Sequence, residues 1–104
     1  MNEYNENGEK HGLWVKYNEN GELMLRGEYF NGIQHGPWEY YYPNGKLWKR
    51  GEYKNGIQHK PWESYFNNGK LNYKCNYLNG QKHGLFEGFD KNGNLKLELT
   101  KFFI

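Results

Sequence analysis

The residues best suited to chemistry in this chain are four histidines that recur at a fixed interval. They are His11, His35, His59 and His83, each 24 residues after the last. An imidazole can bind a metal or transfer protons near neutral pH, so a regular array invites both interpretations. If each interval holds two β-strands, neighbouring histidines lie ~10 Å apart, whereas a zinc ion needs its nitrogen ligands within ~2.1 Å. We therefore expect no metal, and we expect each imidazole to pack on an aromatic ring or to bond to the backbone.

Cys75 is the only cysteine, so no intramolecular disulfide can form. This is typical of a reducing compartment. Because Cys75 takes the place that Gly27 and Gly51 hold in neighbouring repeats, we expect a small buried residue and not a nucleophile.

A set of glutamates recurs at the same interval and could supply paired carboxylates for acid–base work: Glu39, Glu63 and Glu87. Their repetition favours solvated cross-strand partners instead. The sequence has no phosphate-binding loop before a helix, no zinc motif and no nucleophile elbow. We expect no catalytic residue, no cofactor and no enzymatic activity.

The elements that hold these residues are indicated by Asn-Gly dipeptides, the strongest short signal for a type I′ hairpin turn. There are eight: Asn7-Gly8, Asn20-Gly21, Asn31-Gly32, Asn44-Gly45, Asn55-Gly56, Asn68-Gly69, Asn79-Gly80 and Asn92-Gly93. Their spacing alternates between 13 and 11 residues. We predict an unbroken antiparallel meander with two strands in each 24-residue unit, a period that is typical of repeat arrays.

Alignment on the histidines divides the single domain, residues 1–104, into units of roughly 11–34, 35–58, 59–82 and 83–104 after a part-unit at 1–10. Three aligned columns are aromatic or small: Trp14, Trp38, Trp62 and Phe86; Gly27, Gly51, Cys75 and Leu99; Tyr29, Tyr53, Tyr77 and Lys101. The last unit differs from the others, as capping repeats do.

These residues resemble the MORN repeat family. The pattern runs from Tyr29 through Asn31-Gly32 and His35-Gly36 to Tyr42-Pro43-Asn44-Gly45, and it closes on Gly51 and Tyr53. Standard MORN units are slightly shorter and carry glycine where this chain has Trp38. That departure resembles the bacterial MORN-variant branch, whose members include the YwqK-type antitoxins. The resemblance implies an all-β, elongated single-layer sheet of consecutive hairpins, with a structural role for His-Gly.

The composition agrees with a thin sheet. Only 36% of the residues are apolar but 19% are aromatic, against ~45–50% apolar in ordinary globular domains. If the turns have two residues, Trp14 lies opposite Gly27 and Trp38 opposite Gly51, so that each ring covers a glycine across the strand. Glu39 then faces Arg50, and Glu63 faces Lys74. We expect Leu23, Leu47, Leu71 and Leu95 to join the aromatic face. Pro37 and Pro61 predict a bulge in each unit.

Charge and hydropathy limit the partners. Fourteen basic and twelve acidic residues are mixed through every unit, so we expect no nucleic-acid partner, and no basic pocket for a lipid headgroup is evident. No stretch is apolar enough for a signal peptide or a membrane span. We expect a cytoplasmic protein.

The function that fits best is a non-enzymatic binding module that docks a protein on its aromatic face. The resemblance to YwqK-type antitoxins implies a toxin encoded nearby as that protein. Tryptophan and tyrosine often carry interface energy, and the predicted binding residues are Trp14, Tyr29, Trp38, Tyr53, Trp62 and Tyr77. The alternative is a structural scaffold or self-assembling spacer, with lipid-headgroup binding ranked below it. The apolar C-terminal strand, which ends in Phe102 to Ile104, is expected to be covered, either by folding back on the sheet or by pairing with the same strand of a second chain in a homodimer.

Overall fold

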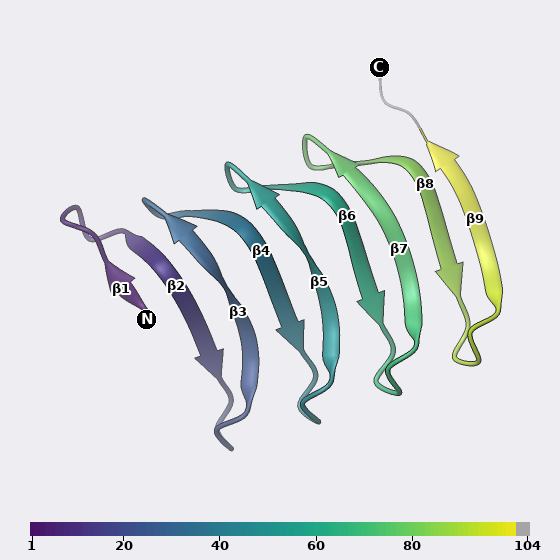
Figure 1. Ribbon diagram of the computed structural model, residues 1–104, viewed down its shortest axis with the longest axis horizontal. Helices are drawn as coiled ribbons and strands as arrows, with labels where there is room; N and C mark the ends of the chain where they lie inside the picture. Colours follow the sequence, from purple (N-terminus) through teal and green to yellow (C-terminus); the bar gives the residue numbers. More distant parts are fainter. Residues whose placement is uncertain (102–104) are drawn as a thin grey trace.

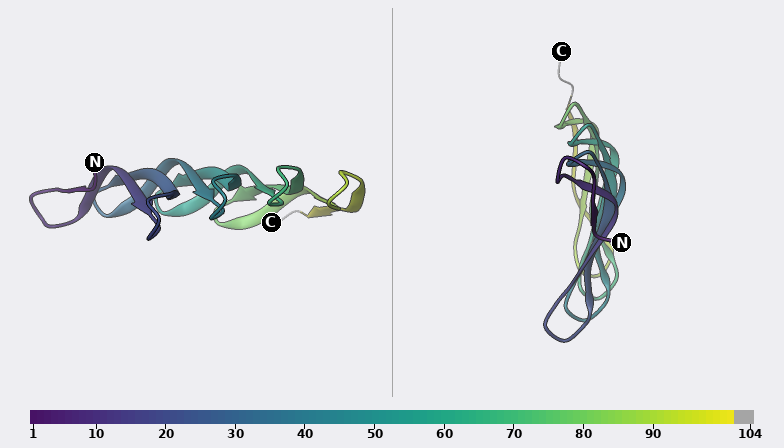
Figure 2. Two further views of the ribbon diagram at one scale, coloured as in Figure 1. Left: turned by 90° about the horizontal axis from the view of Figure 1, so that it is seen from below. Right: turned by 90° about the vertical axis from the view of Figure 1, so that its left-hand side faces the viewer.

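The computed structural model describes residues 1–101, with side chains for residues 1–98. In this range the chain forms nine strands and no helix, and every strand pairs antiparallel with the next along the chain (Figure 1). The sheet measures 47 × 41 × 13 Å, and the two turned views show a single layer (Figure 2). The predicted fold class, an all-β single-layer meander of hairpin repeats, is confirmed.

All strands after the short first one have nearly the same length. They are β1 Glu3–Tyr4, β2 Lys10–Tyr17, β3 Leu23–Phe30, β4 Ile33–Tyr41, β5 Leu47–Lys54, β6 Ile57–Tyr65, β7 Leu71–Leu78, β8 Gln81–Phe89 and β9 Leu95–Lys101.

The turns fall into two classes, which corrects the expectation of a two-residue type I′ turn at every Asn-Gly. Only at Asn31-Gly32, Asn55-Gly56 and Asn79-Gly80 do both residues have positive φ, as a type I′ turn requires. In the other class only the glycine is left-handed. At Asn20-Gly21 the Gly21 N–H donates to the Asn18 carbonyl, and Asn18 Oδ1 accepts from the backbone of Asn20 and Glu22. These longer loops form because a side-chain oxygen mimics a backbone acceptor.

The predicted register is nevertheless observed. Trp14 pairs with Gly27 and Trp38 with Gly51. The longer loop alone would shift this pairing by one residue. A bulge between Lys16 and Tyr17 and its equivalents in later units shift it back, so the two departures from a two-residue turn cancel.

A second bulge occurs where proline predicts one. Arg26 pairs with Glu39 and Glu28 pairs with His35, so Gly27 alone faces the three residues from Gly36 to Trp38. The extra length is accommodated by a left-handed residue, Gly36 at φ 72°. In β6 the equivalent residue is Lys60, a non-glycine at φ 63°, which is a strained backbone position for a lysine.

The two sides of the sheet differ in chemistry. One side, the aromatic face, carries the cross-strand row of tryptophan, tyrosine and small residues that includes Trp38, Gly51, Trp62 and Cys75. The other, the charge face, carries a row that alternates in sign before it ends in two acids: Arg26, Glu39, Arg50, Glu63, Lys74, Glu87 and Glu98. The buried residues Trp38, Trp62 and Cys75 all lie on the aromatic face, so the core of this sheet is one-sided.

The expected place of the leucines is wrong, whereas the expected facing of the charged residues is confirmed in register but not in the ion pairs that form. The leucines pair with Tyr17, Tyr41, Tyr65 and Phe89, which are in phase with the charged row. The cause is the extra residue of the bulge, which directly follows each leucine and reverses the alternation there. Glu39 does lie opposite Arg50, but its ion pair is with Arg26 on the preceding strand, at 2.6 Å. Likewise Glu63 bonds to Arg50 at 3.0 Å. Each of these two glutamates thus has a basic residue on both neighbouring strands and forms its ion pair with the one on the preceding strand.

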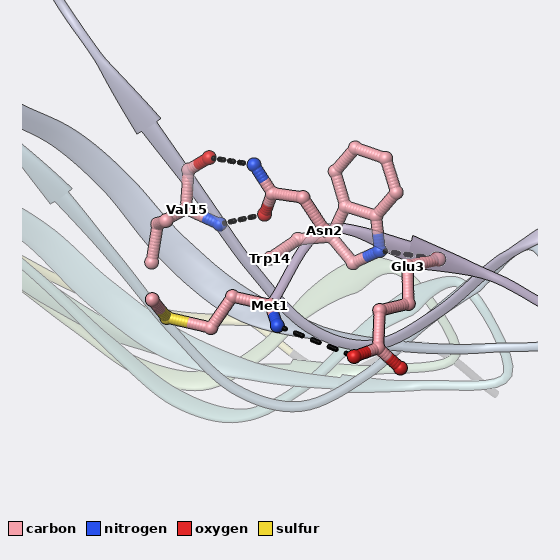
Figure 3. A network of polar contacts seen from close by, with 5 residues as sticks. All are labelled: Met1, Asn2, Glu3, Trp14 and Val15. Atoms are coloured by element: carbon pink, nitrogen blue, oxygen red, sulfur yellow. Dashed lines mark hydrogen bonds and ion pairs between the residues drawn. The ribbon is translucent and has the colours of Figure 1, made fainter.

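The N-terminal edge of the sheet is closed by side-chain bonds (Figure 3). The Asn2 side chain accepts a hydrogen bond from the Val15 N–H at 2.7 Å and donates to the Val15 carbonyl at 2.9 Å, as another strand would. The indole of Trp14 donates to the Glu3 carbonyl at 3.1 Å. These bonds satisfy backbone groups that an edge strand otherwise leaves open to further pairing.

Candidate functional site

The six predicted binding residues form one continuous row on the aromatic face. Their rings meet nearly at right angles, the favoured edge-to-face geometry. From Trp14 through Tyr29, Trp38, Tyr53 and Trp62 to Tyr77, successive ring centroids lie 5.8, 5.2, 5.9, 5.2 and 6.4 Å apart, with interplanar angles of 79–90°. Each ring therefore holds its neighbours in place across the strands.

Two members of the row are almost inaccessible. Trp38 and Trp62 are 2% and 3% exposed, and each indole N–H donates to a backbone carbonyl, of Glu28 and Glu52 respectively, at 3.1 Å. Full burial of an aromatic ring beside a satisfied N–H describes a core residue. These two tryptophans leave little surface for a partner, so contact on this face falls to their neighbours.

The glycine that each indole covers is not the one expected. Trp38 is paired with Gly51, yet its indole lies over Gly27 on the preceding strand, where a Cβ atom would overlap the ring. Trp62 covers Gly51 in the same way. The bulge at Gly36 and Pro37 causes this displacement. Because Gly27 alone faces three residues of β4, the bulge brings Trp38 over Gly27.

The next unit varies this contact in a compensating way. Cys75 replaces the glycine and Phe86 replaces the tryptophan, and the two residues are paired. The smaller ring leaves a hollow of about 260 Å³ that is lined by Cys75, Phe86, Leu85 and Leu97 among others. Burial raises the pKa of the Cys75 thiol, which fits a packing residue better than a nucleophile.

Comparison with known proteins gives the same periodicity. The sequence pattern of the family described as MORN repeat variant matches residues 10–31, 34–55, 58–79 and 82–100. This chain belongs to the MORN repeat variant family. No curated protein matches it.

In this MORN-variant chain the histidines are on the charge face, away from the aromatic row. Glu28 pairs with His35, and Glu52 with His59. His11 behaves as expected for a structural residue, since its ring lies 5.4 Å from Phe30 and its Nδ1 accepts from the Asn31 N–H. Among the described residues no three His, Cys, Asp or Glu side chains gather as metal ligands would. That part of the chain also contains no helix that could cross a bilayer.

Sequence reasoning missed a second row on the aromatic face. It contains Tyr40, Lys49, Ser64 and Tyr73, which pair across successive strands. The Tyr40 hydroxyl lies 3.3 Å from that of Tyr53, and burial together with this bond raises the pKa of Tyr40. Alignment on the histidines could not reveal this row, because its residue type changes in every unit.

Lysines complete the accessible part of the face. The Lys49 ammonium lies 4.8 Å from the Tyr40 ring and 4.4 Å from the Trp48 ring, within the range of a cation–π interaction. Lys10 lies 4.9 Å from Trp14 and 5.1 Å from Tyr29. Trp48 itself is 39% exposed. Trp48 occupies the extra position of the bulge between Tyr40 and Tyr41, which brings its ring against Tyr40.

Proposed function

We propose that this MORN-variant chain is a non-enzymatic module whose aromatic face docks a protein partner. The observation that carries the proposal is the fixed ladder of rings, which holds a rigid surface around the exposed Trp48. A preformed surface binds well because little side-chain freedom is lost on docking. The sheet plane measures 47 × 41 Å, which exceeds the ~800 Å² per partner that a standard interface needs.

The accessible docking surface has two prominent features. One is Trp48, which projects beside Tyr40 and Tyr42. The other is a hollow of about 490 Å³ near the N-terminal end, lined by Trp14, Leu25, Tyr29, Gln34 and Tyr40 among others. An exposed aromatic side chain beside a concave apolar site is the arrangement in which interface energy concentrates.

The resemblance to YwqK-type antitoxins supports a more specific proposal: the partner is a toxin encoded beside this chain, and docking occludes its active site. The single cysteine, buried and unpaired in the structure, supports a cytoplasmic setting, where thiols stay reduced.

Calorimetric titration with the purified product of the neighbouring gene tests the proposal. Trp48→Ala should weaken binding about tenfold or more. Phe30→Ala is the matched control, because Phe30 is 61% exposed on the charge face and should leave binding within about twofold. If Phe30→Ala loses binding and Trp48→Ala does not, the interface lies on the charge face. If both variants bind the partner as tightly as the wild type does, the aromatic face is not the binding site.

A structural scaffold that assembles through β9 is the second candidate. Within the described residues β9 pairs only with β8, and Leu95 and Leu97 are 51% and 47% exposed. The cover predicted from Phe102 to Ile104 concerns residues outside the described part. Sedimentation discriminates the two functions. If the mass of the wild type rises with concentration and Leu97→Lys lowers it to the mass of one chain, the protein assembles through β9. If the wild type keeps the mass of one chain at every concentration, assembly is excluded.

A further inference from the structure

The acidic side chains of this sheet are confined to one face. The strands contain seven acidic residues in the described region, and all are in phase with the charged row: Glu3, Glu28, Glu39, Glu52, Glu63, Glu87 and Glu98. At the aromatic-face positions of the described strands there are Lys10, Lys16, Lys49 and Lys82 but no carboxylate. The formal net charge of +2 therefore hides a strong difference between the two sides.

The lysines of the aromatic face contact rings and not acids. Lys82 lies 4.9 Å from the Phe86 ring, in the arrangement already described for Lys10 and Lys49. The ion pairs in the described part of the chain involve Arg26, Arg50, Lys60 and the N-terminus. Lys10, Lys49 and Lys82 thus place their ammonium groups against aromatic rings, on a face whose described strand positions include no carboxylate.

From this arrangement we propose that the protein partner presents an acidic segment to the aromatic face, with its carboxylates bonded to Lys10, Lys49 and Lys82. The proposal rests on the proposed docking function and adds the chemistry of the partner. A rim of fixed cations around aromatic contacts selects complementary negative charge and speeds the encounter.

The spacing of the lysines favours an acidic protein over a nucleic acid. Lys10 is on β2, Lys49 on β5 and Lys82 on β8, so at ~4.8 Å per strand the outer two lie ~29 Å apart across the sheet. An extended peptide of about nine residues covers that distance at ~3.3 Å per residue. Duplex DNA carries one phosphate per ~3.4 Å of helix axis on each strand, and proteins usually meet this charge density with a denser set of cations. Base stacking also needs open ring faces, and Trp38 and Trp62 are buried.

Fluorescence anisotropy with labelled poly-L-glutamate at low salt tests the proposal on the intact chain. The test variant is Lys10→Gln/Lys49→Gln/Lys82→Gln. The control variant, Lys54→Gln/Lys74→Gln/Lys91→Gln, changes the net charge equally, with two lysines in phase with the charge face and one in a turn. We expect the test variant to bind at least about tenfold more weakly and the control to change less than about threefold. Circular dichroism confirms that both variants are folded.

Several results would overturn the proposal. They are no binding of poly-L-glutamate by the unmodified chain, equal loss in the two variants, or tighter binding of oligo-dT or of phosphatidylserine vesicles at equal anionic charge. The neighbouring gene product separates this inference from the docking function. If Trp48→Ala weakens its binding but the aromatic-face lysine variant does not, docking stands and the acidic partner is rejected.

Discussion

Trp38 covers Gly27, one strand back, and not Gly51, with which it is paired. The distinction matters because a thin sheet has no second layer to bury its rings. The indoles of Trp38 and Trp62 are each buried between a glycine beneath and tyrosines on both sides, as Trp38 is between Tyr29 and Tyr53. The sheet thereby obtains a core from one face alone.

Gly27→Ala should be strongly destabilising. The added methyl group would overlap the indole of Trp38, so the ring must leave its site, and overpacking of this kind costs ~1–3 kcal/mol or more. Gly88→Ala is the control, since its new methyl group would find its nearest neighbour at 3.6 Å. We expect that change to be neutral or to stabilise by up to ~1 kcal/mol. Equal costs in urea unfolding would contradict the assigned contact.

Cys75 and Phe86 should be energetically coupled. Phe86→Trp alone would force an indole against the thiol, and Cys75→Gly alone would enlarge the existing hollow of about 260 Å³, so each should destabilise by ~1–3 kcal/mol. Together they restore the pair found at Trp62 and Gly51. The double variant should recover ~0.5–3 kcal/mol relative to the sum of the single changes. Strict additivity in a double-mutant cycle of unfolding free energies would show that the two sites do not share one packing contact.

Lys60 is strained, and replacing it with glycine should stabilise the sheet. A left-handed conformation costs a side chain ~1–2 kcal/mol, while the exposed ion pair with Glu52 at 3.9 Å contributes ~0–1 kcal/mol. Glycine is also more flexible than lysine in the unfolded chain, which offsets part of this benefit. We therefore expect Lys60→Gly to raise the free energy of unfolding by ~0.5 kcal/mol. Lys54→Gly, in ordinary strand conformation, should instead lose ~0.5–1 kcal/mol. Thermal melts that move in the same direction for both variants would contradict this prediction.

Asp90 should make the stability of the fold depend on pH. Its carboxylate accepts bonds from the backbone of Asn94 and Asn92, and the first of these contributes most to lowering the pKa of Asp90 below its ordinary value of 3.8. A carboxyl group with a lowered pKa in the folded state stabilises the fold above its unfolded pKa, and this contribution is lost as pH falls through the folded value. The melting temperature of the wild type minus that of Asp90→Asn should therefore decrease as the pH falls below about 4. A difference that stays constant through this pH range would contradict the prediction.

Much of this fold follows from the sequence because turns and pattern agree. The eight Asn-Gly dipeptides place the hairpins, and the 24-residue period predicts the single sheet. The pairing of Trp14 with Gly27 is also predicted, although through two shifts that cancel. The alternation of 13 and 11 residues between turns is the signal that could have indicated two turn classes, since a constant turn type would need no such difference.

The candidate site is less predictable from the sequence. Pattern analysis groups Trp38 and Trp62 with the binding residues, because it cannot distinguish a ring that faces solvent from one that a bulge moves over a glycine. The sequence also does not show which basic residue forms an ion pair with Glu39, since Arg26 and Arg50 lie on its two sides. The sequence does not reveal Trp48 as a surface residue of the aromatic face, because its position depends on the bulge in which it is the extra residue.

The most direct test of this account compares Trp38→Ala with His35→Ala in chemical denaturation. The tryptophan row supplies the core of the sheet, whereas the histidines lie on the charge face. Trp38→Ala should lower the free energy of unfolding by ~3–5 kcal/mol, and His35→Ala, an exposed position, should change it by ~0.5 kcal/mol or less. Equal losses, or a bound metal that disappears with His35→Ala, would contradict the account.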